Sequence, residues 1–221
     1  MFAHNPGMAF QTGYLRELQV RRMLELVRAP HVRTYCEIGM NGGHSLAAML
    51  LAHADLECHV FDLFKWRYSE PVASLLNHTY RGRVRFYPGY SKHTLPQFVR
   101  VALIAGRTCD LILIDGGHSE TAVRTDLKQM RAVANASTRV IIDDIGMPGP
   151  AAALKRFVNA GALRIEEQYG PFPSRSSHSP CMRAPAGSSE ARLRSPLQCP
   201  EWGFAVSRYT RPGGGRRGRR R

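Results

Sequence analysis

The 221-residue sequence lacks any run of 18 apolar residues, so we expect no membrane-spanning helix. Its first residues lack the basic stretch and apolar run of a secretory signal. It also lacks a Cys-x-x-Cys pair, and its cysteines are odd in number and scattered. They are Cys36, Cys58, Cys109, Cys181 and Cys199. These absences disfavour a disulfide framework and predict reduced thiols in a cytoplasmic protein.

Acidic residues are scarce, and the formal net charge is +14. The last eleven residues, 211–221, contain six arginines and no acid, so the chain without them would carry +8. Because this tail has no apolar side chain to bury, we expect it to be disordered. It could contact nucleic acid, an acidic membrane surface or an acidic protein through its positive charge, or remain solvated without a partner.

Short apolar runs alternate with stretches of helical periodicity along most of the chain. The expected strands are 34–39, 56–63, 84–89, 109–116, 138–145, 163–170 and 202–209. The expected helices are 14–28, 45–53, 119–134 and 150–160. Residues 111–114 and 140–142 are apolar at every position, which is typical of parallel strands that are covered on both faces.

This alternation predicts an α/β fold with a doubly wound sheet. After residue 161 no helical pattern separates the last two strands, so we expect an antiparallel pair. Their connection, 171–201, is rich in Pro, Ser, Arg and Gly, and we interpret it as an insertion that is either functional or disordered. The domain organisation is therefore an N-terminal helical segment over 1–30, one domain over 31–210 and the tail.

The loop after the first strand reads EIGMNGGHS, residues 37–45. Gly39 and Gly43 permit a tight turn and a close approach of a ligand to the backbone, and a helix that begins at Ser45 offers free N–H groups. The glycine spacing does not match the dinucleotide fingerprint G-x-G-x-x-G, which disfavours a nicotinamide-dependent oxidoreductase. Glu37 would repel a pyrophosphate and would suit a ligand with a cationic or amino group.

Acidic residues also follow three later strands. Asp62 ends the second strand, where a carboxylate can accept hydrogen bonds from both ribose hydroxyls, although an ordinary turn residue is the alternative. Asp115 ends the strand over 109–116, and Asp143 and Asp144 end the strand over 138–145. The alternatives for these acids are a charge that complements the helix beginning near Ser119, and a turn before the next helix.

Five segments occur in an order and spacing that resemble class I S-adenosylmethionine-dependent methyltransferases. They are EIGMNGGHS, FDLF, GYSKHTLPQF, CDLILIDGGHSE and RVIIDDI. The branch with EIG…GxS and IDGxHS motifs, which includes many small-molecule O-methyltransferases, is the most similar. The resemblance covers residues 34–145 well and 150–209 loosely. It implies a Rossmann-like, doubly wound, seven-stranded and mostly parallel sheet with a C-terminal antiparallel hairpin.

The resemblance also implies a site for S-adenosylmethionine. Glu37 would orient the methionine amino group, Asp62 would bind the ribose, and Asp115 would lie beside the transferred methyl group. The residues that would line the methionine and adenine parts are Gly39, Asn41, Gly43, Ser45, Gly89, Tyr90 and Ser91. The sequence departs from many relatives at Tyr90, because GYS stands where they have GDS.

In metal-dependent members of similar pattern, the acids that match Asp115, Asp143 and Asp144 hold Mg²⁺, a cation that prefers oxygen ligands. His118 is a candidate general base for a substrate hydroxyl, and its alternatives are a metal ligand or a loop residue. We therefore expect an S-adenosylmethionine-dependent enzyme that methylates a small-molecule hydroxyl, with Mg²⁺ as a candidate second cofactor. The alternatives are a nucleic-acid-associated methyltransferase or binder that uses the tail 211–221, and a non-catalytic relative.

Overall fold

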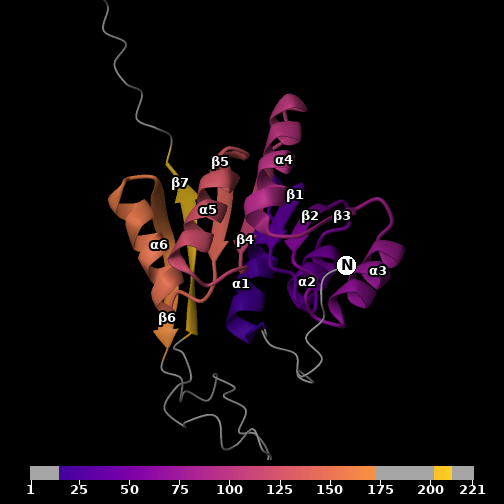
Figure 1. Ribbon diagram of the computed structural model, residues 1–221, viewed down its shortest axis with the longest axis horizontal. Helices are drawn as coiled ribbons and strands as arrows, with labels where there is room; N and C mark the ends of the chain where they lie inside the picture. The colour runs from indigo at the N-terminus through magenta and orange to yellow at the C-terminus, as the bar shows by residue number, and fades with distance from the viewer. Residues whose placement is uncertain (1–14, 173–201, 211–221) are drawn as a thin grey trace, which may run out of the picture.

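A single seven-stranded sheet forms the centre of the protein in the computed structural model, which describes residues 15–172 and 202–210 (Figure 1). The strand order is β3-β2-β1-β4-β5-β7-β6. The strands are β1 (Thr34–Ile38), β2 (Glu57–Asp62), β3 (Val84–Pro88), β4 (Cys109–Ile114), β5 (Ala134–Ile142), β6 (Leu163–Phe172) and β7 (Trp202–Tyr209). The first five pair in parallel, whereas β7 runs antiparallel to both β5 and β6. The predicted parallel sheet with a C-terminal hairpin is confirmed.

In the described part of the chain, six helices cover the two faces of this sheet (Figure 1). They are α1 (Glu17–Val27), α2 (His44–Ala52), α3 (Ser69–Thr79), α4 (Ser91–Ile104), α5 (Glu120–Arg131) and α6 (Pro148–Asn159). Buried residues of α1, α2 and α3 belong to one hydrophobic cluster, and those of α4, α5 and α6 belong to the other. Side chains alternate between the clusters along each strand: Leu111 and Leu113 of β4 lie in the first, and Ile112 and Ile114 in the second. This alternation explains why the central strands are apolar at every position.

The sequence did not predict α3 or α4. Helix α4 contains Pro96, a residue that removes a backbone donor and usually marks a helix boundary. Its buried residues Leu95, Phe98, Val99 and Ala102 nevertheless follow helical spacing and pack on the sheet. Burial of this face therefore outweighs the local preference of the proline.

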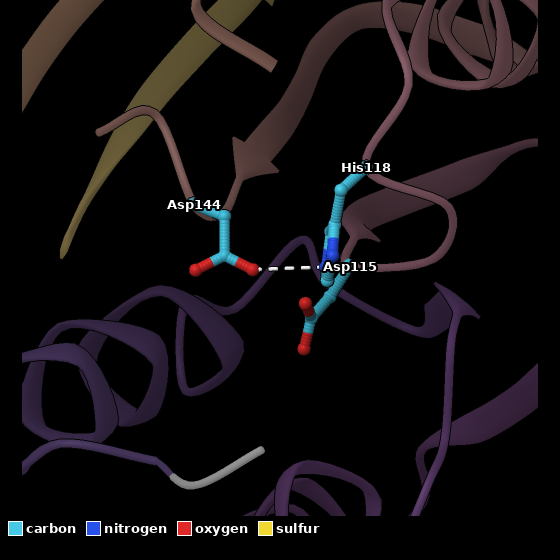
Figure 2. Close-up of side chains that lie close together, drawn as sticks. All are labelled: Asp115, His118 and Asp144. Carbon is cyan, nitrogen blue, oxygen red and sulfur yellow. Dashed lines mark ion pairs between the residues drawn. The ribbon is translucent and has the colours of Figure 1, made fainter. Parts of the chain in front are cut away.

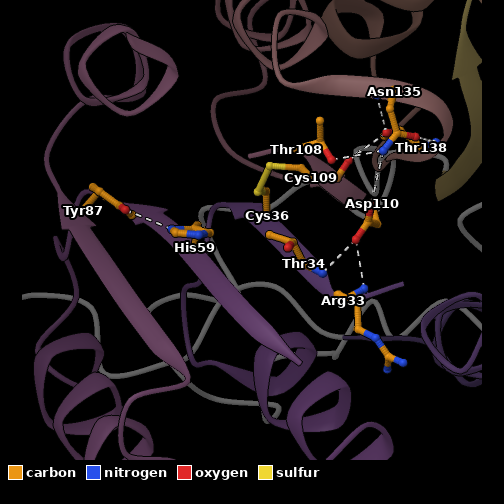
Figure 3. The surroundings of a disulfide bond; sticks show 10 residues. All are labelled: Arg33, Thr34, Cys36, His59, Tyr87, Thr108, Cys109, Asp110, Asn135 and Thr138. Atoms are coloured by element: carbon orange, nitrogen blue, oxygen red, sulfur yellow. Dashed lines mark hydrogen bonds between the residues drawn. A yellow bond between two sulfur atoms is a disulfide. The ribbon is translucent and has the colours of Figure 1, made fainter. Parts of the chain in front are cut away.

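The structure corrects the expectation of reduced thiols, because Cys36 and Cys109 are joined by a disulfide (Figure 3). Cys36 lies in β1 and Cys109 begins the neighbouring strand β4, where the pairing with β5 shifts register between Cys109 and Leu111. Both cysteines lie in the same buried cluster, with their Cα atoms 5.9 Å apart. Because the two cysteines are 73 residues apart and meet only when β1 and β4 pair, their spacing in the sequence does not predict this disulfide. Cys58 is a free, buried thiol, and the remaining two cysteines lie outside the described residues.

Within the described segments, no helix is long and apolar enough to cross a membrane. Strand β6 takes in residues 171 and 172, two positions of the predicted insertion. The rest of that insertion, residues 1–14 and the tail 211–221 lie outside the part of the chain that the structure describes.

The turn after β1 depends on a glycine. Gly39 has φ +94°, and a Cβ atom there would lie 2.0 Å from the Asp115 carbonyl oxygen. Gly82 also has a positive φ, +77°, but a Cβ atom there would meet nothing within 4 Å.

We expect Gly82→Ala to cost about 1–2 kcal/mol of unfolding free energy, because an L-residue is strained in this conformation. Gly39→Ala should cost about 1–3 kcal/mol more, because two loop backbones must separate. Chemical denaturation of both variants measures the difference, and equal losses would contradict it.

Candidate active site

The ends of β1, β4 and β5 are aligned by hydrogen bonds that continue beyond the strands. The Asp115 N–H donates to the Ile38 carbonyl at 2.9 Å, and the Asp143 N–H donates to the Ile114 carbonyl at 3.1 Å. On the other side, the Gly39 N–H donates to the Phe61 carbonyl at 2.8 Å. These bonds place the predicted site residues side by side at the carboxyl edge of the sheet, where ligands bind in open α/β folds.

Asp62 organises the first glycine loop. Its Oδ2 accepts hydrogen bonds from the N–H groups of Met40 and Asn41 at 2.8 and 3.0 Å, and its Oδ1 accepts one from Phe64 N at 2.6 Å. Asn41 has φ 51°, and its side-chain oxygen accepts a hydrogen bond from the Tyr68 hydroxyl at 2.6 Å. The carboxylate predicted to bind ribose therefore also fixes the loop that was predicted to line the methionine moiety.

Glu37 is fully buried in β1, directly before this loop. Its Oε1 accepts a hydrogen bond from the Ser45 hydroxyl at the start of α2, and among the described residues its Oε2 has no hydrogen-bond partner. Burial raises the pKa of Glu37 to about 8, and the Ser45 hydrogen bond offsets only part of that rise. A cationic group placed against Oε2 would stabilise the charged form of this carboxylate.

The residues predicted near adenine lie between β3 and α4. Tyr90 is 57% exposed, with the Lys92 Nζ atom 5.4 Å from its ring centroid. The His93 ring also packs edge-on against it, with the two ring centroids 6.4 Å apart. Sequence reasoning missed Asp126, an acid buried on the core-facing side of α5 whose pKa burial raises to about 6. Asp126 lies three residues after the core residue Val123, and this helical spacing indicates that both side chains share the core-facing side of α5.

Three polar side chains converge where β4 and β5 end (Figure 2). Asp115 and His118 come from the loop after β4, and Asp144 follows β5 with φ 55°. One ligand atom from each of the three lies within 4.8 Å of the others, and the His118 Nε2 atom is 3.0 Å from the Asp144 Oδ2 atom. The geometry suits a divalent cation or a proton acceptor.

The structure differs from the predicted metal set at Asp143. This carboxylate is buried and accepts a hydrogen bond from the Gln19 side chain of α1 at 2.5 Å. Its other oxygen accepts one from the Asp144 N–H at 2.8 Å. Asp143 therefore lies next to the cluster without belonging to it, and His118 takes the third position. Gln19 was missed because a polar residue on an N-terminal helix gives no sequence signal of a contact 124 positions away.

Burial and mutual repulsion control the charges of this cluster. Burial raises the pKa of Asp115, and the charges of Asp143 and Asp144 raise it further. The hydrogen bond to Asp144 raises the pKa of His118 above its ordinary value. Acids that repel one another in a partly buried site favour the arrival of a cation or the retention of a proton.

The α1 helix and the last strand contribute a further side of the site. The Arg16 guanidinium, directly before α1, lies 4.3 Å from the ring centroid of the buried Trp202 in β7. Its charge acts against the rise in pKa of both Asp115 and Asp143. Arg16 and Trp202 were not singled out from the sequence, because only the fold brings these two distant segments together.

A doubly wound sheet with an antiparallel final strand and acids at its carboxyl edge defines the class I methyltransferase architecture. Residues 36–145, about half of the chain, match a family model described as a methyltransferase domain. This match identifies residues 36–145 as a methyltransferase domain, and the chain is therefore a methyltransferase. No curated protein sequence matches it.

Solved structures share the fold at low sequence identity. The O-methyltransferase TomG from Streptomyces achromogenes, involved in tomaymycin synthesis and solved with S-adenosylmethionine, aligns with a TM-score of 0.64 at 14% identity over 89% of this chain and 82% of that one. A candidate O-methyltransferase from Klebsiella pneumoniae aligns with a TM-score of 0.61 at 16% identity, over 90% and 82%. A candidate caffeoyl-CoA O-methyltransferase from Staphylococcus aureus aligns with a TM-score of 0.60 at 13% identity, over 90% and 86%.

The contact between His118 and Asp144 predicts a pH-dependent ion pair. Because the folded pKa of His118 is raised, the pair stabilises the protein below pH ~6.5, and this contribution is lost as the pH rises through the folded pKa. Titration by NMR should place the His118 pKa above its ordinary value. Asp144→Asn should lower it clearly, and Asp143→Asn should lower it less. A His118 pKa that does not respond to Asp144→Asn would contradict the assignment.

Proposed function

We propose that this enzyme transfers the methyl group of S-adenosylmethionine to a hydroxyl oxygen of a small molecule. The observation that carries the proposal is the convergence of Asp115, His118 and Asp144 at the carboxyl edge of the sheet. Methyl transfer to a hydroxyl requires a group that removes the hydroxyl proton, and this cluster holds a histidine and two carboxylates. The named O-methyltransferases with the same fold support the choice of oxygen as acceptor.

The two acids that would bind the cofactor lie at the carboxyl ends of β1 and β2. Glu37 would face the amino group of the methionine moiety through Oε2, where burial makes a cation favourable. Asp62 would approach the ribose hydroxyls while it holds the glycine loop. Gly39, Asn41, Gly43 and Ser45 would surround the methionine moiety, and Tyr90 and Ser91 would lie near adenine.

The reaction is an in-line displacement at carbon. The oxygen–carbon bond forms as the carbon–sulfur bond breaks, which leaves S-adenosylhomocysteine, and the hydroxyl proton must leave the acceptor oxygen. His118 would accept this proton, and the adjacent Asp144 would stabilise the imidazolium that results. Holding the oxygen and the methyl group in line lowers the entropic cost of the reaction.

The cluster also fits a divalent cation, because two carboxylates and one imidazole are within reach of a single ion. Such an ion lowers the pKa of a bound hydroxyl and orients it. The imidazole shifts the preference from Mg²⁺, which favours oxygen ligands, towards Mn²⁺ and later transition metals. His118 cannot ligate an ion and accept the proton at the same time, so a binding measurement separates two forms of the proposal.

The buried Glu37 predicts that cofactor binding releases a proton. Near pH 7 most of this carboxyl is protonated, since its pKa is about 8, and an ammonium group beside it would drive the proton off. Calorimetry with S-adenosylhomocysteine in phosphate and Tris buffers, with and without Mg²⁺, counts that proton. Glu37→Gln should abolish the release and weaken binding about 10- to 100-fold. Glu57→Gln, an exposed acid at the opposite edge, is the matched control and should change neither. Binding without proton release in the unmodified enzyme would contradict the role of Glu37.

Metal binding should distinguish Asp144 from its neighbour Asp143. Mn²⁺ titration followed by electron paramagnetic resonance should show an affinity that falls at least about tenfold in Asp144→Asn and in His118→Ala, because each removes a ligand. Asp143→Asn should change it less than threefold, because that carboxylate is bonded to Gln19. Loss in Asp144→Asn without loss in His118→Ala would leave His118 as the base. Absence of Mn²⁺ binding in the unmodified enzyme would rule out the metal-assisted form.

A further inference from the structure

The residues around the start of α3 hold Asn41, which lies in the loop after β1. The Ser69 hydroxyl donates to the Asn41 carbonyl at 3.1 Å, and the Tyr68 hydroxyl donates to the Asn41 Oδ1 atom at 2.6 Å. Asp62, at the end of β2, accepts a hydrogen bond from the Asn41 N–H at 3.0 Å. Three polar groups of one loop residue are therefore held by a single segment of the chain, residues 62–69.

These bonds keep Asn41 in an uncommon backbone conformation. Its φ of 51° lies in the left-handed region, where Asn and Asp are better tolerated than most other residues. Two positions later, Gly43 lies so close to α3 that a Cβ atom there would be 2.8 Å from a methyl group of Val72. The loop is thus held against α3 at both Asn41 and Gly43.

Tyr68 is itself held by neighbouring side chains. The Trp66 ring stacks against it with an interplanar angle of 9° and ring centroids 6.3 Å apart, and the Lys65 Nζ atom lies 4.6 Å from the Trp66 ring centroid. This stack limits the directions in which the Tyr68 ring can turn, and so it keeps the Tyr68 hydroxyl directed at Asn41.

The Tyr68 hydrogen bond decides which end of the Asn41 amide can meet a ligand. A carboxamide has one acceptor oxygen and one donor nitrogen, so an oxygen that is held by a hydroxyl turns the nitrogen away from that hydroxyl. The Asn41 Nδ2 atom is then oriented to donate to an acceptor such as a carboxylate. The acids Glu37, Asp115 and Asp144 would repel a carboxylate at this edge of the sheet, so a donor is needed to hold one there.

The same loop offers complementary partners for an ammonium group and a carboxylate. The buried Glu37 precedes it, with the Ser45 hydroxyl bonded to its Oε1 atom. Helix α2 follows it, beginning at His44 with Gly43 as N-cap, and a helix N-terminus favours negative charge. An α-amino acid carries its ammonium and its carboxylate on one carbon atom, so it requires two such partners close together.

We propose that the Asn41 amide binds the carboxylate of the methionine moiety, and that Tyr68 is the positioning residue that orients this amide. The inference rests on the proposed function, because S-adenosylmethionine must occupy the loop after β1. It assigns the carboxylate of the cofactor, whereas Glu37 would face the ammonium group. Tyr68 acts only through Asn41 and does not touch the cofactor.

The test compares two ligands by calorimetry on the full 221-residue chain. S-adenosylhomocysteine carries both the ammonium and the carboxylate, whereas decarboxylated S-adenosylhomocysteine keeps the ammonium alone. Asn41→Ala should weaken binding of S-adenosylhomocysteine about tenfold or more, because a hydrogen bond to a charged group is lost. Tyr68→Phe should weaken it about threefold to tenfold, because the amide is no longer oriented. Neither variant should weaken binding of the decarboxylated ligand.

Asn41→Asp separates charge from loop structure. It keeps a residue that tolerates the left-handed conformation and an oxygen that accepts the Tyr68 hydrogen bond. It also places a negative charge beside the ligand carboxylate, so it should weaken binding of S-adenosylhomocysteine about 30-fold or more. The decarboxylated ligand, which is purely cationic at this end, should bind equally well or more tightly. A distorted loop would weaken binding of both ligands.

The matched control is Tyr80→Phe, which removes a hydroxyl of the same kind at the opposite end of α3 and should change neither affinity. Glu37→Gln should weaken both ligands alike, because both carry the ammonium group. Equal weakening of the two ligands by Asn41→Ala or Tyr68→Phe would overturn the proposal alone, in favour of a structural role. Unchanged affinity of Asn41→Ala for S-adenosylhomocysteine would also overturn it. Absence of binding of either ligand by the unmodified chain would overturn it together with the proposed function.

Discussion

The hydrogen bonds that continue the β1–β4–β5 ladder beyond its strands are the constraint on which the site depends. They join Asp115 to Ile38 and Asp143 to Ile114, so each acid follows its strand in a fixed position. The close contact of Gly39 with the Asp115 carbonyl locks the first loop against the fourth strand. These backbone contacts hold the strand-end acids and the first loop in defined positions, which is what catalysis by positioning requires.

Rigid placement at the end of a buried sheet has an electrostatic consequence. Glu37 and Asp143 are buried and Asp115 is half-buried, and burial is the largest cause of the raised pKa of each. A folded protein that keeps such acids loses stability as the pH rises through the range where they ionise. Buried acids of this kind suit a site that binds cationic groups, because each bound cation stabilises the ionised carboxylate and recovers part of the lost stability.

Local patterns were sufficient to predict the strands, their parallel pairing and the final hairpin, since apolar runs that are covered on both faces leave few other arrangements. They were also sufficient to place Glu37, Asp62 and Asp115 at strand ends. Local patterns did not predict contacts between segments that are distant in the sequence. The Gln19–Asp143 hydrogen bond, the disulfide and helix α4 each depend on tertiary packing that overrides a local preference or has no local sign. The structure brings His118, one of the alternatives that the sequence left open, together with Asp115 and Asp144. The metal set of Asp115, Asp143 and Asp144 stays a prediction.

Helix α5 begins beside the acidic cluster and ends in basic residues. Ser119 caps its beginning through a hydrogen bond with the Ala122 N–H, one residue after His118 in the acidic cluster. Lys128 and Arg131 lie in its last turn, where positive charge is favoured by the helix dipole. The dipole accounts for basic residues at that end, but it does not account for Arg124 in the middle of the helix or Arg156 on α6. These two arginines share a single carboxylate. The Arg124–Glu120 pair joins successive turns of α5, and the Arg156–Glu120 pair joins α6 to α5, so both arginines stabilise the packing of this helix pair.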